Sequence, residues 1–74
     1  MQADTLVKMA NQIGDFFEAM PDRDEAMQGI AQHLKNFWDP RMRRELLRRL
    51  DAGQAGELHR MVVDAIGAHR QLIQ

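Results

Sequence analysis

The sequence contains no cysteine, serine or tyrosine, and Thr5 is its single threonine. Without cysteine, the chain can form neither disulfide bonds nor thiolate sites for zinc or iron–sulfur clusters. Among catalytic nucleophiles, this leaves little beyond lysine, carboxylate and histidine side chains. The composition therefore argues against an enzyme, and we expect no catalytic, cofactor-binding or metal-binding residues in this chain.

Long apolar runs and a strong net charge are also missing. No run approaches the ~18–20 apolar residues of a membrane span, and no signal-peptide pattern opens the chain, so we expect a cytoplasmic protein without a membrane partner. Ten basic and eleven acidic residues give a net charge of −1, which argues against general attraction to nucleic acid. The chain is long enough for one small domain, residues 1–74, whose core is marginal without a disulfide or a metal. Helix packing, or a partner that completes the core, must supply the stability.

Helical periodicity is the main pattern that is present. It predicts four helices joined by short turns, at residues 5–20, 22–38, 40–51 and 57–72. Pro21, the Asp39-Pro40 pair and Gly53 mark the breaks between them. The β-branched residues are too few, and alternate too poorly, to predict a strand. The expected fold is all-α, a small bundle of about four short helices with antiparallel neighbours.

Each predicted helix carries an apolar face that we expect to form the core. The first two faces comprise Leu6, Met9, Ala10, Ile13, Phe16, Phe17 and Met20, and then Ala26, Met27, Ile30, Leu34, Phe37 and Trp38. The last two comprise Met42, Leu46, Leu47 and Leu50, and then Leu58, Met61, Val62, Ala65, Ile66, His69, Leu72 and Ile73. Gly14, Gly29 and Gly67 lie inside predicted helices, where each glycine lowers helix stability by up to about 1 kcal/mol relative to alanine. These glycines mark close helix crossings or contact with a partner backbone, or they are simply tolerated in helices that packing holds together.

The junction of the second and third helices joins two bulky aromatic rings to a rigid turn. We expect Phe37 in the core and Trp38 at the core edge or in an interface, because tryptophan beside arginine is typical of interface anchors. Arg43 falls inside the apolar stripe of its helix. Its charge must therefore either snorkel to solvent or form a fixed ion pair, within the domain or across an interface.

Half of the basic residues gather in the third helix: Arg41, Arg43, Arg44, Arg48 and Arg49. Residues 15–25 form an acidic counterpart. A nucleic-acid-binding role would place the third helix along phosphates, but acidic residues interrupt it and no row of base-reading Asn or Gln accompanies it. We favour a solvated face that pairs with the acidic segment or with a partner's carboxylates.

The three histidines, His33, His59 and His69, are far apart and lack the H-x-x-x-H spacing of metal ligands. We therefore expect them to be structural. The carboxylates at residues 22–25 cluster at a helix start, where capping accounts for them.

Two stretches of the chain form a distinctive pattern. Residues 6–14 (LVKMANQIG) are followed by Phe16-Phe17, and residues 33–35 (HLK) are followed by residues 37–43 (FWDPRMR). The first stretch resembles the opening, and the second the central part, of the delta subunit of NAD-dependent molybdenum formate dehydrogenases. The resemblance covers roughly residues 5–50, whereas the final helix matches only in its amphipathic character.

The resemblance implies a non-catalytic accessory subunit of a cytoplasmic complex. In such complexes, a large catalytic subunit carries bis-molybdopterin guanine dinucleotide and iron–sulfur clusters, and other subunits carry FMN and bind NAD. The delta subunit has no redox centre of its own and is linked to assembly, cofactor maturation or stability of the complex. We expect docking on the large subunit, with the methionine-bearing first helix as support. The expected docking residues are Phe37, Trp38, Asp39, Pro40, Arg41, Met42 and Arg43.

Two other functions stay open at this point. One is a small nucleic-acid-binding regulatory protein that uses the arginine-rich helix. The other is a self-associating protein whose homodimer completes the core, and sedimentation with and without the enzyme separates it from a heteromeric subunit.

Overall fold

The structure is a computed structural model that describes the backbone of residues 3–54 and 56–74, and the side chains of residues 5–54 and 56–74. Its elements are α1 (Ala3–Glu18), α2 (Arg23–Phe37), α3 (Pro40–Asp51), α4 (Arg60–Ala68) and α5 (Arg70–Ile73). Since all regular elements of the described residues are helices, the all-α prediction is confirmed, and the first three helices begin and end within two residues of the predicted positions. None of these helices has the length and apolar character needed to cross a membrane.

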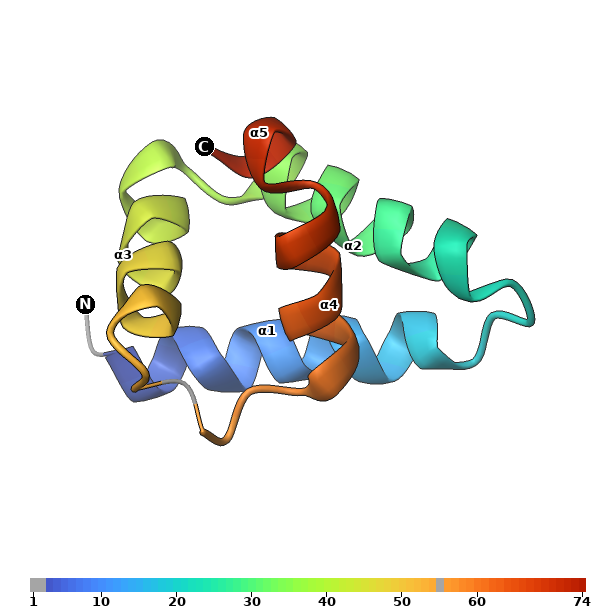
Figure 1. The fold of residues 1–74 in the computed structure, drawn as a ribbon, viewed down its shortest axis with the longest axis horizontal. Coiled ribbons are helices and arrows are strands. Elements are labelled where there is room, and N and C mark those ends of the chain that lie inside the picture. Colours follow the sequence, from blue (N-terminus) through green and yellow to red (C-terminus); the bar gives the residue numbers. More distant parts are fainter. Residues whose placement is uncertain (1–2, 55) are drawn as a thin grey trace.

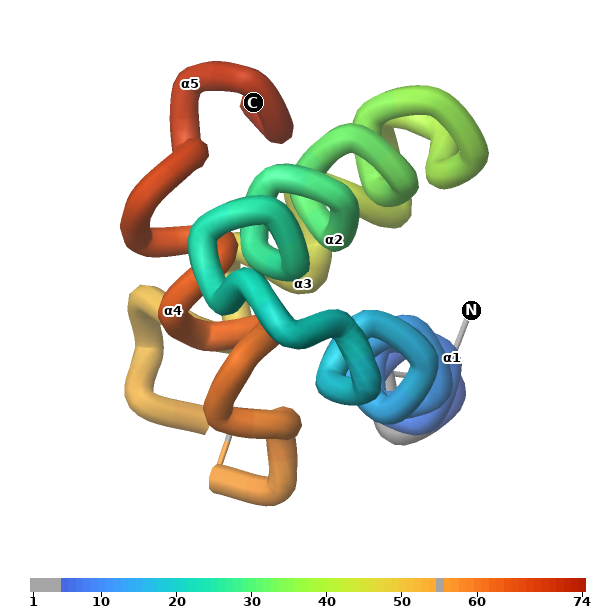
Figure 2. The backbone as a smooth tube through the Cα atoms, turned by 90° about the vertical axis from the view of Figure 1, so that its right-hand side faces the viewer, coloured from blue at the N-terminus to red at the C-terminus, as the bar shows by residue number. Residues whose placement is uncertain are grey.

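Helices α1 and α2 run in opposite directions and form a V that is closed at the turn around Pro21 (Figure 1). Helix α4 lies across the V and contacts both of its arms, and α5 contacts α2. Helix α3 spans the open end of the V and packs against α1 (Figure 1). Figure 2 shows that α4 and α5 lie on one side of the α1–α2 pair. The covered side of the pair forms the core.

The largest fully buried side chains come from α1 to α5 and all lie on predicted apolar faces. They are Leu6, Ile30, Leu34, Leu46, Val62, Ile66 and Ile73. Burial of each such side chain contributes about 1.5–3 kcal/mol before the entropy of ordering the chain is subtracted. The periodicity therefore identified the centre of the core correctly.

The prediction of a single helix at residues 57–72 is wrong. Helix α4 begins only at Arg60, and the helix is interrupted at His69, whose φ of −127° and ψ of 34° are not helical. Residues after the break form α5, which contacts α2 and buries Ile73 completely. His69, expected at the centre of the apolar face, lies in this break and is half-buried. The apolar surface that Ile73 covers on α2 compensates for the interrupted helical hydrogen bonding.

Three residues predicted in the core are instead exposed. The exposed fraction is 36% for Met9 and 73% for both Phe16 and Phe37. The predicted apolar arc of ~120° on α1 and α2 is wider than the surface that the crossing helix α4 covers. An apolar strip on each of the two helices therefore stays open to solvent.

Two glycines lie at close contacts, as the sequence suggested. A Cβ atom at Gly14 would lie 2.8 Å from Cγ of His59 and 2.9 Å from Cγ2 of Val62. A Cβ atom at Gly29 would lie 2.5 Å from the Phe17 ring. These contacting atoms belong to the His59 ring and to the branched side chain of Val62, and neither is the far end of a flexible side chain. The start of α4 can therefore approach α1 this closely only because residue 14 has no side chain.

We expect Gly14→Ala to destabilise the protein by about 1–3 kcal/mol, because overpacking forces α4 away from α1. Gly67→Ala is the matched control: a Cβ there meets nothing within 4 Å, so alanine should stabilise α4 by up to about 1 kcal/mol. Urea unfolding of both variants measures these changes. A neutral or stabilising Gly14→Ala would show that the crossing is not tight.

An ion pair joins the end of α3 to the start of α5. Nη1 and Nη2 of Arg70 donate hydrogen bonds to the two carboxylate oxygens of Asp51, at 2.9 and 2.5 Å. These hydrogen bonds hold the pKa of Asp51 below its ordinary value. A carboxyl whose pKa is lowered by folding stabilises the folded state above its unfolded pKa, and this contribution is lost as the pH falls through the folded pKa.

We therefore expect Asp51→Asn to lower the melting temperature slightly at about pH 7, and the difference from the parent to disappear below about pH 3. The effect is small because the pair is exposed to solvent. Thermal unfolding across this pH range tests it, with Glu57→Gln as a control that removes an exposed carboxylate elsewhere. A difference in melting temperature that persists below about pH 3 would show that the stabilisation does not come from the ionised Asp51 carboxylate.

Candidate partner-binding site

An apolar groove runs between α1 and α2. It has a volume of about 580 Å³ and is lined by Met9, Gln12, Ile13, Phe16, Phe17, His33, Phe37 and Trp38. It collects Met9, Phe16 and Phe37, the large apolar side chains that the structure describes as exposed. Apart from His33, none of the residues that line it is ionisable. The groove therefore has the character of a surface for an apolar partner.

Ring contacts hold the aromatic side chains of the groove in place. Phe16 and Phe17 meet edge to face with ring centroids 5.1 Å apart. On α2, the rings of His33 and Phe37 lie 4.7 Å apart with an interplanar angle of 36°. Rings that are ordered before binding lose little conformational freedom when a partner covers them.

Of the two aromatic residues at the end of α2, Trp38 lies where we expected it and Phe37 does not. The prediction of Phe37 in the core is wrong, because the residue is 73% exposed, whereas Trp38 is 5% exposed and belongs to the core at its edge. The backbone N–H of Trp38 donates to the carbonyl oxygen of Leu34 at 3.1 Å and ends α2. Trp38 thus anchors the corner between α2 and α3, and Phe37 presents its ring to the groove.

The residues that follow mostly build the corner between α2 and α3. Oδ1 of Asp39 accepts a hydrogen bond from the backbone N–H of Met42 at 2.9 Å and caps α3, and Pro40 occupies the first helical turn. Met42 is half-buried and packs against the core. Arg41 is exposed on α3. Of the expected docking residues, the structure therefore brings only Phe37 and Trp38 into the groove.

Arg43 makes an internal hydrogen bond to a backbone carbonyl group, which is neither of the two arrangements that we considered. Its Nη1 donates to the backbone carbonyl oxygen of Lys35 at 3.3 Å. Lys35 lies in the last turn of α2, where carbonyl groups lack helical partners and the helix dipole favours a cation. The guanidinium group therefore ties α3 to the end of α2.

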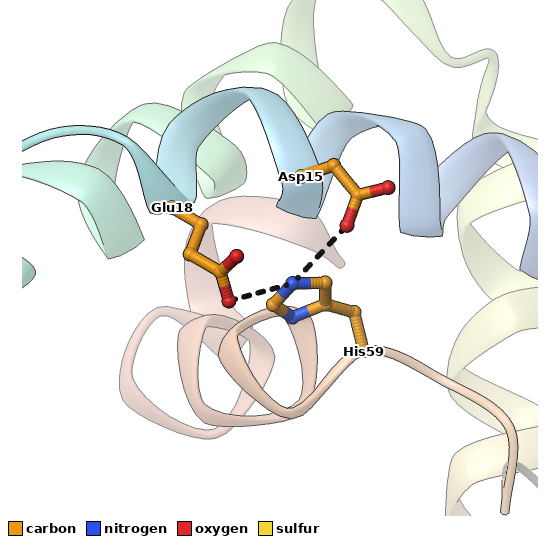
Figure 3. Close-up of side chains that lie close together, drawn as sticks. All are labelled: Asp15, Glu18 and His59. Carbon is orange, nitrogen blue, oxygen red and sulfur yellow. Dashed lines mark ion pairs between the residues drawn. The ribbon is translucent and has the colours of Figure 1, made fainter.

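A second cluster, which the sequence did not reveal, lies between α1 and α4. Nε2 of His59 lies 3.4 Å from Oδ1 of Asp15 and 3.2 Å from Oε2 of Glu18 (Figure 3). The three residues offer ligand atoms within 4.8 Å of one another. Because His59 is far from Asp15 and Glu18 in the sequence, no local spacing marks the cluster.

Hydrogen bonding at His59 favours a structural clasp over a metal site. Nδ1 of His59 accepts a hydrogen bond from the backbone N–H of Met61 at 3.1 Å and caps α4. A neutral imidazole with an accepting Nδ1 carries its proton on Nε2, the atom that faces Asp15 and Glu18. The Nε2 proton then faces the two carboxylates, and Nε2 has no lone pair for a metal ion.

Asn11 completes this contact between α1 and the start of α4. Its Nδ2 donates to the carbonyl oxygen of Glu57 at 2.9 Å, and its Oδ1 accepts from the backbone N–H of His59 at 2.6 Å. We refer to Asn11, Asp15, Glu18 and His59 as the α1–α4 clasp. It holds the residues before α4 against α1.

We expect neutral His59 to carry its proton on Nε2, and equimolar zinc to leave its ring resonances unchanged, because Nδ1 already accepts a hydrogen bond from Met61 and Nε2 carries the proton. Nitrogen-15 NMR of the imidazole ring measures both. A proton on Nδ1, together with a zinc-induced shift of the ring resonances that Asp15→Asn abolishes, would show that the clasp is a metal site.

Comparison with known proteins identifies one family. The family model described as NADH-dependent formate dehydrogenase delta subunit FdsD matches residues 5–66, a range that contains the whole groove and the clasp. Neither curated proteins nor solved structures give a significant match. Since the family model covers well over half of the sequence, the chain belongs to the NADH-dependent formate dehydrogenase delta subunit family.

Proposed function

We propose that this chain is a non-catalytic accessory subunit of a cytoplasmic molybdenum formate dehydrogenase, and that it docks on the large catalytic subunit through the α1–α2 groove. The observation that carries this proposal is the gathering of Met9, Phe16 and Phe37 in one groove. A partner that covers apolar surface gains about 25 cal/mol per Å² removed from water. Docking of this kind supports assembly, cofactor maturation or stability of the complex.

In this proposal, the cofactors reside in other subunits. Bis-molybdopterin guanine dinucleotide and iron–sulfur clusters belong to the large subunit, and the flavin and iron–sulfur subunits carry FMN and bind NAD. The chain has no cysteine to hold a cluster. Its histidine–carboxylate cluster is engaged in joining α1 to α4. The role of the chain is therefore steric and electrostatic.

The corner between α2 and α3 gives the groove one rigid wall. Buried Trp38, the Asp39 cap and the contact of Arg43 with α2 hold the end of α2 in place. The ring of Phe37 is presented from this fixed end, and it lines the same groove as Phe16 of α1. Aromatic anchors on rigid elements are typical of residues that dominate binding energy.

We expect the double variant Phe16→Gln, Phe37→Gln to lose binding to the complex. Truncation of a dominant aromatic anchor costs about 2 kcal/mol or more, which is about thirtyfold in affinity. The variant chain, tagged and co-expressed with the other formate dehydrogenase subunits, should retain the large subunit poorly on purification. Its own melting temperature should change little, because both side chains are exposed in the isolated chain.

The matched control is Gln28→Ala, Gln71→Ala, which alters two exposed residues outside the groove. It should retain the large subunit as the parent does. Trp38→Ala is unsuitable because the buried ring supports the fold. Full retention of the large subunit by the Phe16, Phe37 variant would refute docking through the groove. Sedimentation of the isolated parent shows whether the groove instead joins two copies of the chain.

A further inference from the structure

The outer face of α3 is a second surface, which the groove does not use. Arg41, Arg44 and Arg48 fall within an arc of about 60° on this helix, at 100° per residue. Together with Glu45 they line a hollow of about 420 Å³. We refer to the three arginines as the basic face. Three cations and one anion leave it positively charged, although the chain as a whole has a net charge of −1.

Only part of this charge is neutralised within the molecule. Nε and Nη2 of Arg48 donate to the two carboxylate oxygens of Glu45, at 3.0 and 2.6 Å. The hydrogen bond from Arg48 keeps the pKa of Glu45 below its ordinary value, so Glu45 is ionised and already engaged. Arg41 and Arg44 are exposed, and among the described residues they have no hydrogen bond or ion pair. Two guanidinium groups one helical turn apart are therefore available to a partner.

We propose that the basic face binds an acidic peptide segment of a protein partner. Three residues of helix place Arg41 and Arg44 about 4.5 Å apart along the axis, and Arg48 follows about 6 Å further on. Carboxylates that repeat every three or four residues on a partner helix have the same spacing. Guanidinium groups hold carboxylates in bidentate pairs, which adds geometric specificity to the charge attraction.

The extent of the basic face favours a peptide over a nucleic acid. The three arginines span only about 10 Å of helix axis, and the next hollow along α3 contains Asp51 beside Arg70. Duplex DNA carries one negative charge per ~1.7 Å of its axis, so it matches a longer basic surface without interrupting carboxylates. A short acidic segment needs only the contacts that Arg41 and Arg44 offer. The basic face is separate from the groove, so this proposal does not depend on the proposed docking.

Binding of labelled peptides to the full chain tests the proposal by fluorescence anisotropy. The probe is a helical peptide whose glutamates repeat every fourth residue, and its control has glutamine in their place. We expect the glutamate peptide to bind at least about tenfold more tightly, and to weaken as salt rises from about 50 to 200 mM. Arg41→Glu, Arg44→Glu should weaken binding at least about tenfold, and the milder Arg41→Gln, Arg44→Gln about threefold.

The matched control is Lys8→Glu, Arg60→Glu, which changes the net charge equally at two exposed positions outside α3. It should leave peptide affinity within about twofold of the parent. If this control lost as much peptide affinity as the Arg41, Arg44 variant, the net charge of the chain would explain binding and the proposal would be refuted. Tighter binding to a DNA duplex than to the peptide would identify a nucleic-acid site instead. The Phe16→Gln, Phe37→Gln variant should bind the peptide as the parent does. The proposal for the basic face can therefore fail while the proposal for the groove holds, and the reverse.

Discussion

The close crossing of α4 over α1 at Gly14 determines the rest of the structure. Without a side chain at residue 14, the ring of His59 and the branched side chain of Val62 lie directly against the α1 backbone. The α1–α4 clasp fixes this approach with hydrogen bonds from Asn11 and contacts from Asp15 and Glu18. Because α4 then fills one side of the V, the other side stays open, and the apolar groove is a direct consequence of where α4 lies.

Features of the fold that depend on neighbours in the sequence could be predicted. Asp22 accepts a hydrogen bond from the backbone N–H of Glu25 at 3.1 Å, and Asp39 caps α3 in the same way, because a cap needs only the residues of one helical turn. The break at His69 could not be predicted, since it depends on the surface of α2 that receives Ile73. The clasp at His59 was missed for the same reason, as it joins elements far apart in the chain.

The two aromatic residues at the end of α2 were predicted only in part, for a physical reason: Trp38 lies at the edge of the core as expected, but Phe37 is exposed. A helical wheel places Phe37 and Trp38 on one apolar arc, yet α2 ends at Phe37. Trp38 has an extended backbone, with φ of −93° and ψ of 134°, so its direction no longer follows the helical period. The wheel also cannot tell which part of a wide arc a crossing helix covers. Exposure of Phe16 and Phe37 follows from that tertiary arrangement.

The corner at residues 37–43 connects the apolar groove to the basic face. Phe37 lines the first surface and Arg41 the second, while Trp38, Asp39 and Arg43 make the connection between them rigid. Two modest surfaces held at a fixed angle bind one complex more tightly than either does alone, provided that the partner engages both. A partner that binds only the folded chain also stabilises it by mass action. A small core without disulfides is therefore sufficient for a chain that acts within a larger assembly.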